Sequence, residues 1–182
     1  MAYYEILSGL KKPETLIEFE GKGRADRLFG YFISDTLDGK FLEYTTPIGV
    51  AQEDMKESDL DKLDYLDAVI GIPIFSEKVV DKFSLLLAHE VKFYPIEIKC
   101  KSKTKTFFLT KIIRYEAWID HDKSEYRTLF DGSKLLRSIA TKSTESEFYF
   151  AKDTVSVTDW AVSEKFKRLI EKNGMKMRFH EI

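Results

Sequence analysis

The chain has 182 residues, 43% of them apolar and 14% aromatic, which is enough to bury a sizeable core and argues against disorder. Its formal net charge of -2 argues against a general nucleic-acid binder, so we expect no nucleic-acid partner. The single cysteine, Cys100, excludes a disulfide framework and a cysteine-based zinc site.

The first ten residues carry no basic stretch followed by an apolar core, so no signal peptide is predicted. The longest uncharged apolar run, Ala68–Ser76, has nine residues and is too short to span a bilayer. We therefore expect a cytoplasmic protein with no membrane partner. Its length predicts one domain over residues 1–182, with a strand-rich part at 1–68 and a second part at 69–182.

The strand-rich part has alternating or β-branched stretches separated by turn residues. We predict strands at Tyr3–Leu7, Leu16–Glu20, Leu28–Ser34 and Phe41–Thr45. The dipeptide Asp38–Gly39 is a favoured turn, so the last two strands are expected to form a hairpin.

Residues 53–67 change the composition sharply, with seven acids against two lysines. Leucines near helical spacing predict a short helix, capped by Ser58 or Asp59, that presents acids outward. A solvated helix face is the simpler interpretation. The alternative is a docking surface for a basic partner, because acids so close together repel one another and an opposite charge relieves the repulsion. The predicted partner-binding residues are Glu53, Asp54, Glu57, Asp59, Asp61 and Asp64.

A strand–helix–strand order occurs twice. The first copy has an apolar approach at Gly71–Phe75, an amphipathic helix beginning after Ser76 and a strand at Val91–Ile98. Its hydroxyl makes Ser76 a candidate N-cap. The helix stripe is expected from Val79, Val80, Phe83, Leu86 and Leu87.

The second copy runs from Asp159 to Ile182, with Ser163 as the candidate N-cap and Asn173–Gly174 as the helix stop. The two outgoing strands match at Lys92 with Lys176, Glu97 with Glu181 and Ile98 with Ile182. The sequence thus predicts two principal amphipathic helices and an internal duplication. Coincidence is the alternative, because Ser-Glu-Lys is a common helix start.

Four lysines alternate between the two copies and predict a hairpin tip, where they discourage strand-to-strand aggregation. They are Lys99, Lys101, Lys103 and Lys105. The stretch Thr106–Asp120 that follows is the longest strand candidate and is predicted to be central in a mainly antiparallel sheet. The expected fold class is therefore α+β with a mostly antiparallel sheet.

Asp120–His121–Asp122 is the nearest approach to a catalytic or metal-binding cluster, since two carboxylates and an imidazole can bind a cation. Neighbours on a strand point to opposite faces, so the three converge only if the chain turns there. A polar turn at a strand end is the favoured interpretation, and no catalytic, cofactor-binding or metal-binding residue is predicted. Further strands are expected at Tyr126–Phe130 and, as strand or short helix, at Leu135–Ala140.

The order of these features resembles a bacterial family, immunity protein family eleven of the polymorphic-toxin systems, formerly a domain of unknown function. The resemblance covers Val69–Ile182, and residues 1–68 match only in length and general character. It rests on Gly71–Lys78, Val91–Ile98, Trp118–Asp120 with Ser124, Val162–Ile170 and Met175–Ile182. These motifs resemble scaffold, so no functional residue is carried over from them.

The resemblance implies a non-enzymatic cytoplasmic protein that binds and neutralises a cognate toxin from a contact-dependent or secreted system. A rival class is an enzyme or small-molecule binder with a site assembled around Asp120–Asp122 and Arg114. A deep polar pocket with converging titratable groups would favour that class. A third class is a structural or regulatory module with another partner.

Overall fold

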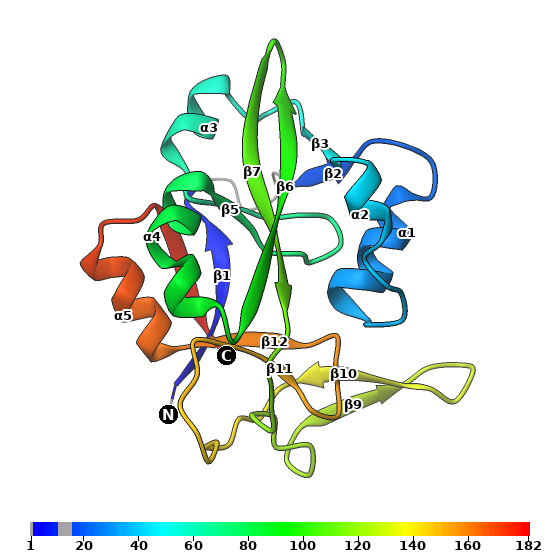
Figure 1. The fold of residues 1–182 in the computed structure, drawn as a ribbon. Helices are drawn as coiled ribbons and strands as arrows, with labels where there is room; N and C mark the ends of the chain where they lie inside the picture. The colour runs from blue at the N-terminus through cyan, green and yellow to red at the C-terminus, as the bar shows by residue number, and fades with distance from the viewer. Residues whose placement is uncertain (1, 11–15) are drawn as a thin grey trace.

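The computed structural model describes residues 2–10 and 16–182, and helices flank the β-sheets of this part of the chain on two sides (Figure 1). Helices α4 and α5 lie to the left in Figure 1, and α1 and α2 lie to the right of the long strands β6 and β7. Most strand pairs are antiparallel, which confirms the predicted α+β class.

The larger sheet has six strands within the described residues, in the order β2-β3-β6-β7-β5-β4. They are β2 (Ile17–Phe19), β3 (Ile48–Ala51), β4 (Tyr65–Leu66), β5 (Ile74–Ser76), β6 (Val91–Cys100) and β7 (Lys103–Ile112). The β6–β7 hairpin turns at residues 101–102, so the predicted lysine-bearing tip is confirmed.

The smaller sheet has five strands in the described ranges, in the order β13-β1-β12-β11-β8. They are β1 (Tyr3–Ser8), β8 (Tyr115–Glu116), β11 (Phe150–Asp153), β12 (Trp160–Ser163) and β13 (Met177–Glu181). A separate hairpin consists of β9 (Glu125–Thr128) and β10 (Lys134–Ser138).

The helices are short, and none in the described part is long and apolar enough to cross a membrane. They are α1 (Arg24–Leu28), the π-helix η1 (Phe29–Ile33), α2 (Phe41–Tyr44), α3 (Glu57–Lys62), α4 (Glu77–Leu87) and α5 (Glu164–Lys172). Gly174 has a φ of 62°, so the predicted glycine stop of α5 is confirmed.

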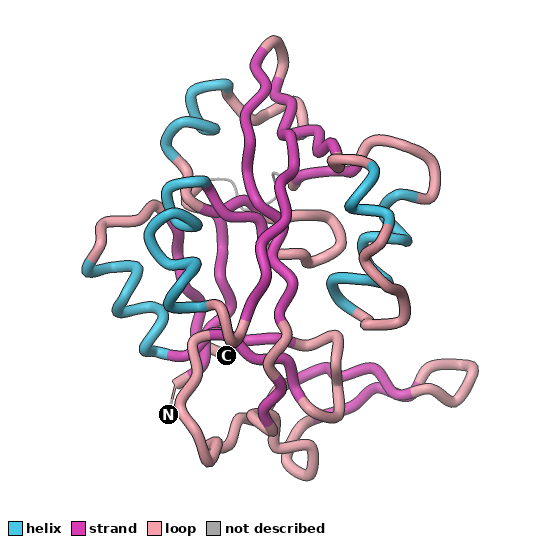
Figure 2. The backbone as a smooth tube through the Cα atoms, in the orientation of Figure 1, coloured by secondary structure: helices cyan, strands magenta, loops and turns pink. Residues whose placement is uncertain are grey.

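The two strand–helix–strand stretches share one topology (Figure 2). In the first unit, β5 and β6 both pair antiparallel with β7, which lies between them. In the second unit, β12 and β13 both pair antiparallel with β1, which comes from the opposite end of the chain. A hairpin strand precedes each unit at its edge, β4 beside β5 and β11 beside β12.

The register identifies equivalent positions in the two units. Ser76 lies opposite Phe107 of β7, and Ser163 lies opposite Tyr3 of β1. On the other side of each central strand, Ile96 lies opposite Phe107, and the backbone N–H of Ile182 bonds to the carbonyl of Tyr3. Ile96 and Ile182 are thus equivalent positions. The predicted match of Ile98 with Ile182 is therefore displaced by two residues.

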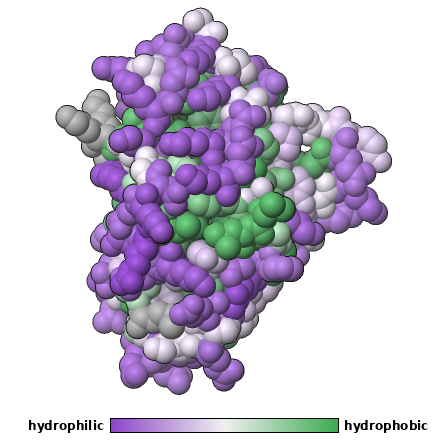
Figure 3. Space-filling model, turned by 60° about the vertical axis from the view of Figure 1, so that its left-hand side comes forward, coloured by the Kyte–Doolittle hydropathy of each residue, from purple (hydrophilic) through white to green (hydrophobic). Residues whose placement is uncertain are grey.

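Both helices pack into one core. The ring centroids of Phe150 and Phe166 are 4.5 Å apart, and Phe75 lies 5.9 Å from Phe150 and 6.3 Å from Phe166. Val79 and Phe83 of α4 are buried in the same cluster. The side of the molecule carrying α4 and α5 is otherwise largely hydrophilic, with an apolar patch near its middle (Figure 3).

Two predicted strands in the N-terminal part are wrong, because Leu28–Ser34 lies in α1 and η1 and Phe41–Thr45 in α2. Short apolar runs do not distinguish a buried strand from a buried helix. Leu28, Phe32 and Ile33 are all buried where η1 packs on the larger sheet. Tertiary burial therefore decides the conformation of this segment.

The predicted N-cap positions at Ser76 and Ser163 are confirmed, but the predicted side-chain hydrogen bonds to the helices are wrong. Neither Ser76 nor Ser163 makes a side-chain hydrogen bond to its helix. The hydroxyl of Ser76 donates to Asp64 at 2.8 Å, and the hydroxyl of Ser163 donates to the carbonyl of Phe148. Both serines are buried between strands, so their hydroxyls bond across the sheet rather than to the first helical turn.

The long strand predicted at Thr106–Asp120 is central but shorter than expected. β7 lies between β6 and β5 and ends at Ile112. The backbone N–H of Ile113 then bonds to the carbonyl of Glu90, and the chain enters the smaller sheet at β8. The continuous strand pattern of this stretch therefore contributes β7 to the larger sheet and β8 to the smaller one.

Candidate functional site

The acidic segment contains α3, which confirms the predicted short helix. The helix begins at Glu57, and the carboxylate of Asp59 accepts the backbone N–H of Lys56 at 3.0 Å. The predicted cap position at Ser58 or Asp59 is therefore wrong, because Asp59 acts from within the first turn.

The hairpin tip supplies partners for these acids. Glu57 accepts the backbone N–H of Ser102 at 2.8 Å, and Asp61 pairs with Lys103 at 2.5 Å and with Lys105 at 3.6 Å. Hydrogen bonds from Ser102 and Lys103 hold the pKa values of Glu57 and Asp61 below their usual range. The repulsion that suggested a basic partner is thus partly relieved within the chain.

Asp64 does not face outward, which corrects its place among the predicted partner-binding residues. Its side chain is buried and accepts the Ser76 hydroxyl at 2.8 Å and the backbone N–H of Lys176 at 2.7 Å. An inward carboxylate with such donors joins two strands rather than meeting a partner. Glu53 and Asp54 remain exposed.

The triplet Asp120–His121–Asp122 does not converge. Asp120 pairs with Lys123 at 2.9 Å, whereas the Nε2 atom of His121 lies 2.7 Å from Asp153. Nδ1 of the same imidazole bonds to Tyr126, so both ring nitrogens are occupied. No group of three or more potential metal ligands occurs in the described ranges.

Asp153, which the sequence did not single out, is the residue that orients His121. It is fully buried and accepts backbone N–H groups from Ile119, Val155 and Ser156. Burial opposes its charge, yet these donors and His121 hold the pKa of Asp153 below its usual value. The arrangement fixes the loop that follows β11.

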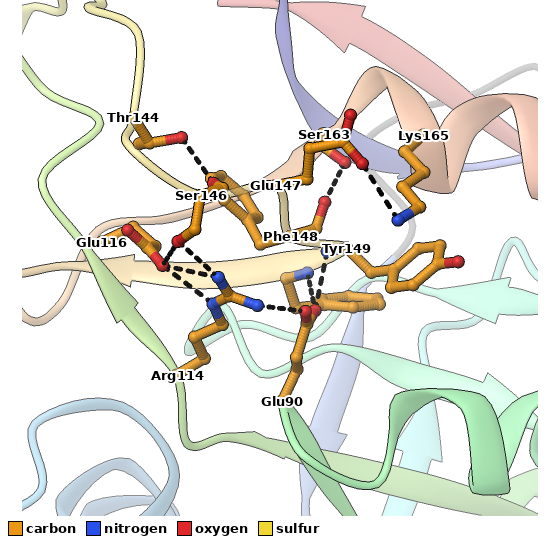
Figure 4. Close-up of polar contacts among 11 residues, drawn as sticks. Glu90, Arg114, Glu116, Thr144, Ser146, Glu147, Phe148, Tyr149, Ser163 and Lys165 are labelled. Carbon is orange, nitrogen blue, oxygen red and sulfur yellow. Dashed lines mark hydrogen bonds and ion pairs between the residues drawn. The ribbon is translucent and has the colours of Figure 1, made fainter.

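Arg114 lies apart from this histidine, in a polar junction between the two units (Figure 4). Glu90 accepts one of its N–H groups at 2.7 Å and the backbone N–H groups of Tyr149 and Phe150 at 2.7 and 2.8 Å. Glu116 accepts from the same guanidinium at 2.7 Å. The buried Glu90 thus joins the start of β6 to the start of β11.

A second charged cluster, the lysine cluster of Asp35, Lys111 and Lys152, anchors η1. Lys152 is fully buried and its Nζ lies 2.6 Å from both Asp35 and the carbonyl of Ile33. Lys111 bonds to Asp35 and to the carbonyl of Tyr31. Burial lowers the pKa of both lysines to about 8, and Lys152 adds to the effect at Lys111.

The β9–β10 hairpin projects from the body as an arm, clear of both main sheets (Figures 1 and 2). Phe130 at its tip is fully exposed, and Leu129, Leu135 and Tyr126 are exposed in part. The tip is ordered by Asp131, whose carboxylate accepts the backbone N–H and the hydroxyl of Ser133. The arm thus presents apolar side chains on a defined scaffold.

A cavity of about 610 Å³ lies on the face of the smaller sheet away from α5. Its ionisable lining residues are Glu5, Asp67, Asp159, Arg137 and His180. Glu5 lies opposite His180 in the β1–β13 pair. Burial raises the pKa values of Glu5 and Asp67, and the charge of Asp67 adds to the effect at Glu5.

No ion pair of Glu5, Asp67 or Asp159 forms within the described part of the chain. Trp118 and Trp160 also line this cavity. Trp118 is fully buried, and its indole N–H has no hydrogen-bond partner among the described residues. A buried donor without a partner is costly in a folded protein.

No protein-family model and no curated protein matches the chain. Function must therefore be argued from the arm, the exposed acids and the cavity. The sequence did not indicate the cavity, because its residues come from both ends and the middle of the chain. The sequence indicated the arm through the predicted strands Tyr126–Phe130 and Leu135–Ala140, with the turn residues Asp131–Gly132 between them.

Proposed function

We propose that this chain is a non-enzymatic immunity protein that binds and neutralises a cognate toxin in the bacterial cytoplasm. The proposal joins the resemblance to immunity protein family eleven with one structural observation, the projecting arm with Phe130 at its tip. Exposing a large apolar side chain on a defined hairpin benefits a protein chiefly when a partner covers it.

The arm is suited to presenting this anchor. The backbone N–H of Leu129 bonds to the carbonyl of Ser133 at 2.8 Å, and Gly132 takes a φ of 82° that suits a tight turn. A preformed loop loses less conformational entropy on binding. Covering Phe130 fully would contribute roughly 1.5–3 kcal/mol from burial alone.

Charge distinguishes the arm from α3. Arg127, Lys134 and Arg137 outnumber Glu125 and Asp131 on the arm, so it carries a small positive charge. We expect the toxin surface that contacts the arm to have an apolar pocket for its tip and to accommodate the basic residues of the arm. The exposed acids would influence mainly the rate of encounter.

The test is to search the neighbourhood of the gene of this chain for a toxin domain and to co-express the chain with any toxin domain found there. The intact chain should restore growth, and the double variant Phe130→Ser, Leu135→Ser should lose protection while its thermal unfolding stays unchanged. Leu85→Ser is the matched control, because Leu85 is 93% exposed on α4 and lies far from the arm in sequence.

Two outcomes would contradict parts of the proposal. Full protection by the arm variant would remove the arm from the interface. Failure of the intact, folded chain to protect would instead exclude immunity towards that toxin and favour a structural or regulatory role.

The acids Glu53, Asp54 and Asp61, which are exposed, and Glu57 and Asp59, which are half-buried, are proposed to steer the same partner. Because Asp61 already pairs with Lys103 and Lys105, reversal of Glu53 to lysine is the cleaner test. It should slow association in a salt-dependent way without changing the dissociation rate. An unchanged association rate at low salt would exclude a steering role.

We further propose that the two units are repeats of one motif. The observation that supports it is the shared order of an edge strand, a strand, a helix and a strand around a central antiparallel strand. Ser76 and Ser163 then occupy equivalent positions before their helices.

A further inference from the structure

The two equivalent units differ in what covers the sheet face away from their helices. On the first unit, η1 lies there, and Phe32 packs edge-on against Tyr94 with ring centroids 5.5 Å apart. The hydroxyls of Tyr31 and Tyr94 are hydrogen-bonded at 2.5 Å. The chain itself fills this face.

Equivalent positions on the second unit line the 610 Å³ cavity. Glu5 lies opposite His180 on β1, as Leu109 lies opposite Tyr94 on β7. Tyr65 of β4 pairs with Phe75, and Phe150 of β11 pairs with Val162, so Tyr65 and Phe150 occupy equivalent positions. Asp67 and Lys152 each lie two residues further along the chain and are equivalent in the same way. The face that η1 covers on the first unit is thus left partly open on the second.

Among these positions, Asp67 and Lys152 carry opposite charges, whereas the counterpart of Glu5 is the apolar Leu109. Lys111 of β7 in the first unit and Lys152 of β11 in the second unit share the carboxylate of Asp35, which the chain supplies. Glu5 of β1 in the second unit and Asp67, which follows β4 of the first unit, line the cavity. Asp67 accepts the backbone N–H of Ser8 at 2.9 Å, and no ion pair joins Glu5 or Asp67 to another described residue. A group that complements them must be positive, as Asp35 is negative at the lysine cluster.

The remaining lining refines the chemistry of that group. Two tryptophan side chains suit a cation on an apolar stem, because an indole face attracts cations. The unpaired indole N–H of Trp118 requires an acceptor, such as a carbonyl oxygen. The described residues offer no cluster of three or more metal ligands, which disfavours a metal ion.

We propose that this cavity binds an organic cation, an alkylammonium or guanidinium group next to a carbonyl, with the cation between Glu5 and Asp67 and the carbonyl accepting from Trp118. The proposal does not depend on toxin binding. The same chemistry could be carried by a free small molecule or by a basic residue of a protein.

Intrinsic fluorescence is a direct readout, because both tryptophans of the chain line the cavity. L-argininamide should change the emission saturably at millimolar concentration, and L-citrullinamide, which lacks the positive charge, should not. Agmatine, which lacks the carbonyl, should bind more weakly than L-argininamide. A blocked Gly-Arg-Gly peptide that binds more tightly than L-argininamide would assign the site to a basic residue of a protein, and weaker binding would assign it to a free ligand.

The variant Glu5→Gln should raise the Kd for L-argininamide at least tenfold, because one of two opposing charges is lost. Asp81→Asn is the matched control, since Asp81 is exposed on α4, and it should leave the Kd unchanged. Trp118→Phe should remove the preference for L-argininamide over agmatine. Thermal unfolding of each variant verifies that it is folded.

The proposal would be overturned by any of three results with folded protein. They are the absence of a saturable change up to about 10 mM ligand, equal responses to L-argininamide and L-citrullinamide, and an unchanged Kd in Glu5→Gln.

Discussion

The two strand–helix–strand units share a topology but differ in how they are completed. The first is built from consecutive residues, with β4 to β7 following one another, and η1 covers its outer face. The second takes its central strand β1 from the other end of the chain, and its outer face holds a cavity. The same scaffold therefore supports a closed unit and an open one, and we locate ligand binding on the open one.

The largest effect is expected in the core that both units share. Phe166→Ala should destabilise the protein by about 3–5 kcal/mol, because Phe166 is fully buried against Phe75 and Phe150. Leu85→Ala, at an exposed position on α4, should change stability by less than about 0.5 kcal/mol. Urea unfolding checks both, and separate transitions for the two units would contradict a shared core.

Next in size are the two carboxylates that join the units. Glu90→Gln should cost about 3 kcal/mol, because Glu90 accepts two backbone N–H groups and also pairs with Arg114. Asp64→Asn should cost less, about 1–2 kcal/mol, because an amide oxygen can still accept from Ser76 or Lys176. Calorimetry measures the loss of stability in each variant. Equal losses would show that the ion pair between Glu90 and Arg114 adds no stability.

A smaller, pH-dependent effect is expected at the lysine cluster. Asp35→Asn should cost about 2 kcal/mol at pH 7, because Lys111 and Lys152 lose their counter-charge. Since burial lowers both lysine pKa values to about 8 in the folded protein, the folded state binds fewer protons than the unfolded chain above that pH. The loss should therefore shrink as pH rises from 7 towards 10, and a loss independent of pH would contradict this account.

The smallest effect, with the opposite sign, is expected at the open unit. Burial and the charge of Asp67 raise the pKa of Glu5, so the folded state favours its protonated form and stability falls as pH rises through that pKa. Glu5→Gln should therefore stabilise the ligand-free protein at pH 7. The gain should be less than about 1 kcal/mol, because a large part of the Glu5 side chain stays in contact with solvent, which screens its charge. A melting temperature below that of the parent chain would contradict an uncompensated charge there.

Local signals predicted much of this fold. The amphipathic stripe beginning at Val79, the glycine stop at Gly174 and the lysine-bearing tip of the β6–β7 hairpin all depend on residues close in sequence. The glycine stop and the tip were correct, and in the predicted stripe Val79, Phe83 and Leu87 are buried, whereas Leu86 is exposed. Periodicity and turn chemistry operate over a few residues, so such features can be predicted locally.

Long-range contacts account for the errors. Serine is a residue type that often caps helices, yet the hydroxyls of Ser76 and Ser163 bond to Asp64 and to the carbonyl of Phe148, which lie next to neighbouring strands. Asp64 belongs to an acidic run in the sequence but lies inside the protein, because β13 brings the backbone of Lys176 to it. Leu28–Ser34 became helical where the larger sheet covers it.

The candidate sites were hardest to predict for the same reason. The cavity combines residues of β1, β4 and β13 with others, and the two carboxylates proposed to hold the cation, Glu5 and Asp67, are 62 positions apart in the sequence. His121 was recognised, but its partner Asp153 follows β11 and belongs to no local motif. Only the sheet order brings such residues together.

The most direct test is a residue-resolved NMR titration of the intact protein with L-argininamide. The account predicts amide shifts at Glu5, Asp67 and His180 around the cavity. It predicts none at Leu109, the position of the closed unit that corresponds to Glu5, or at Lys152, which Asp35 already pairs. Shifts at both sets of positions, or at neither, would contradict the central claim that the two units share a scaffold and only one is open to a ligand.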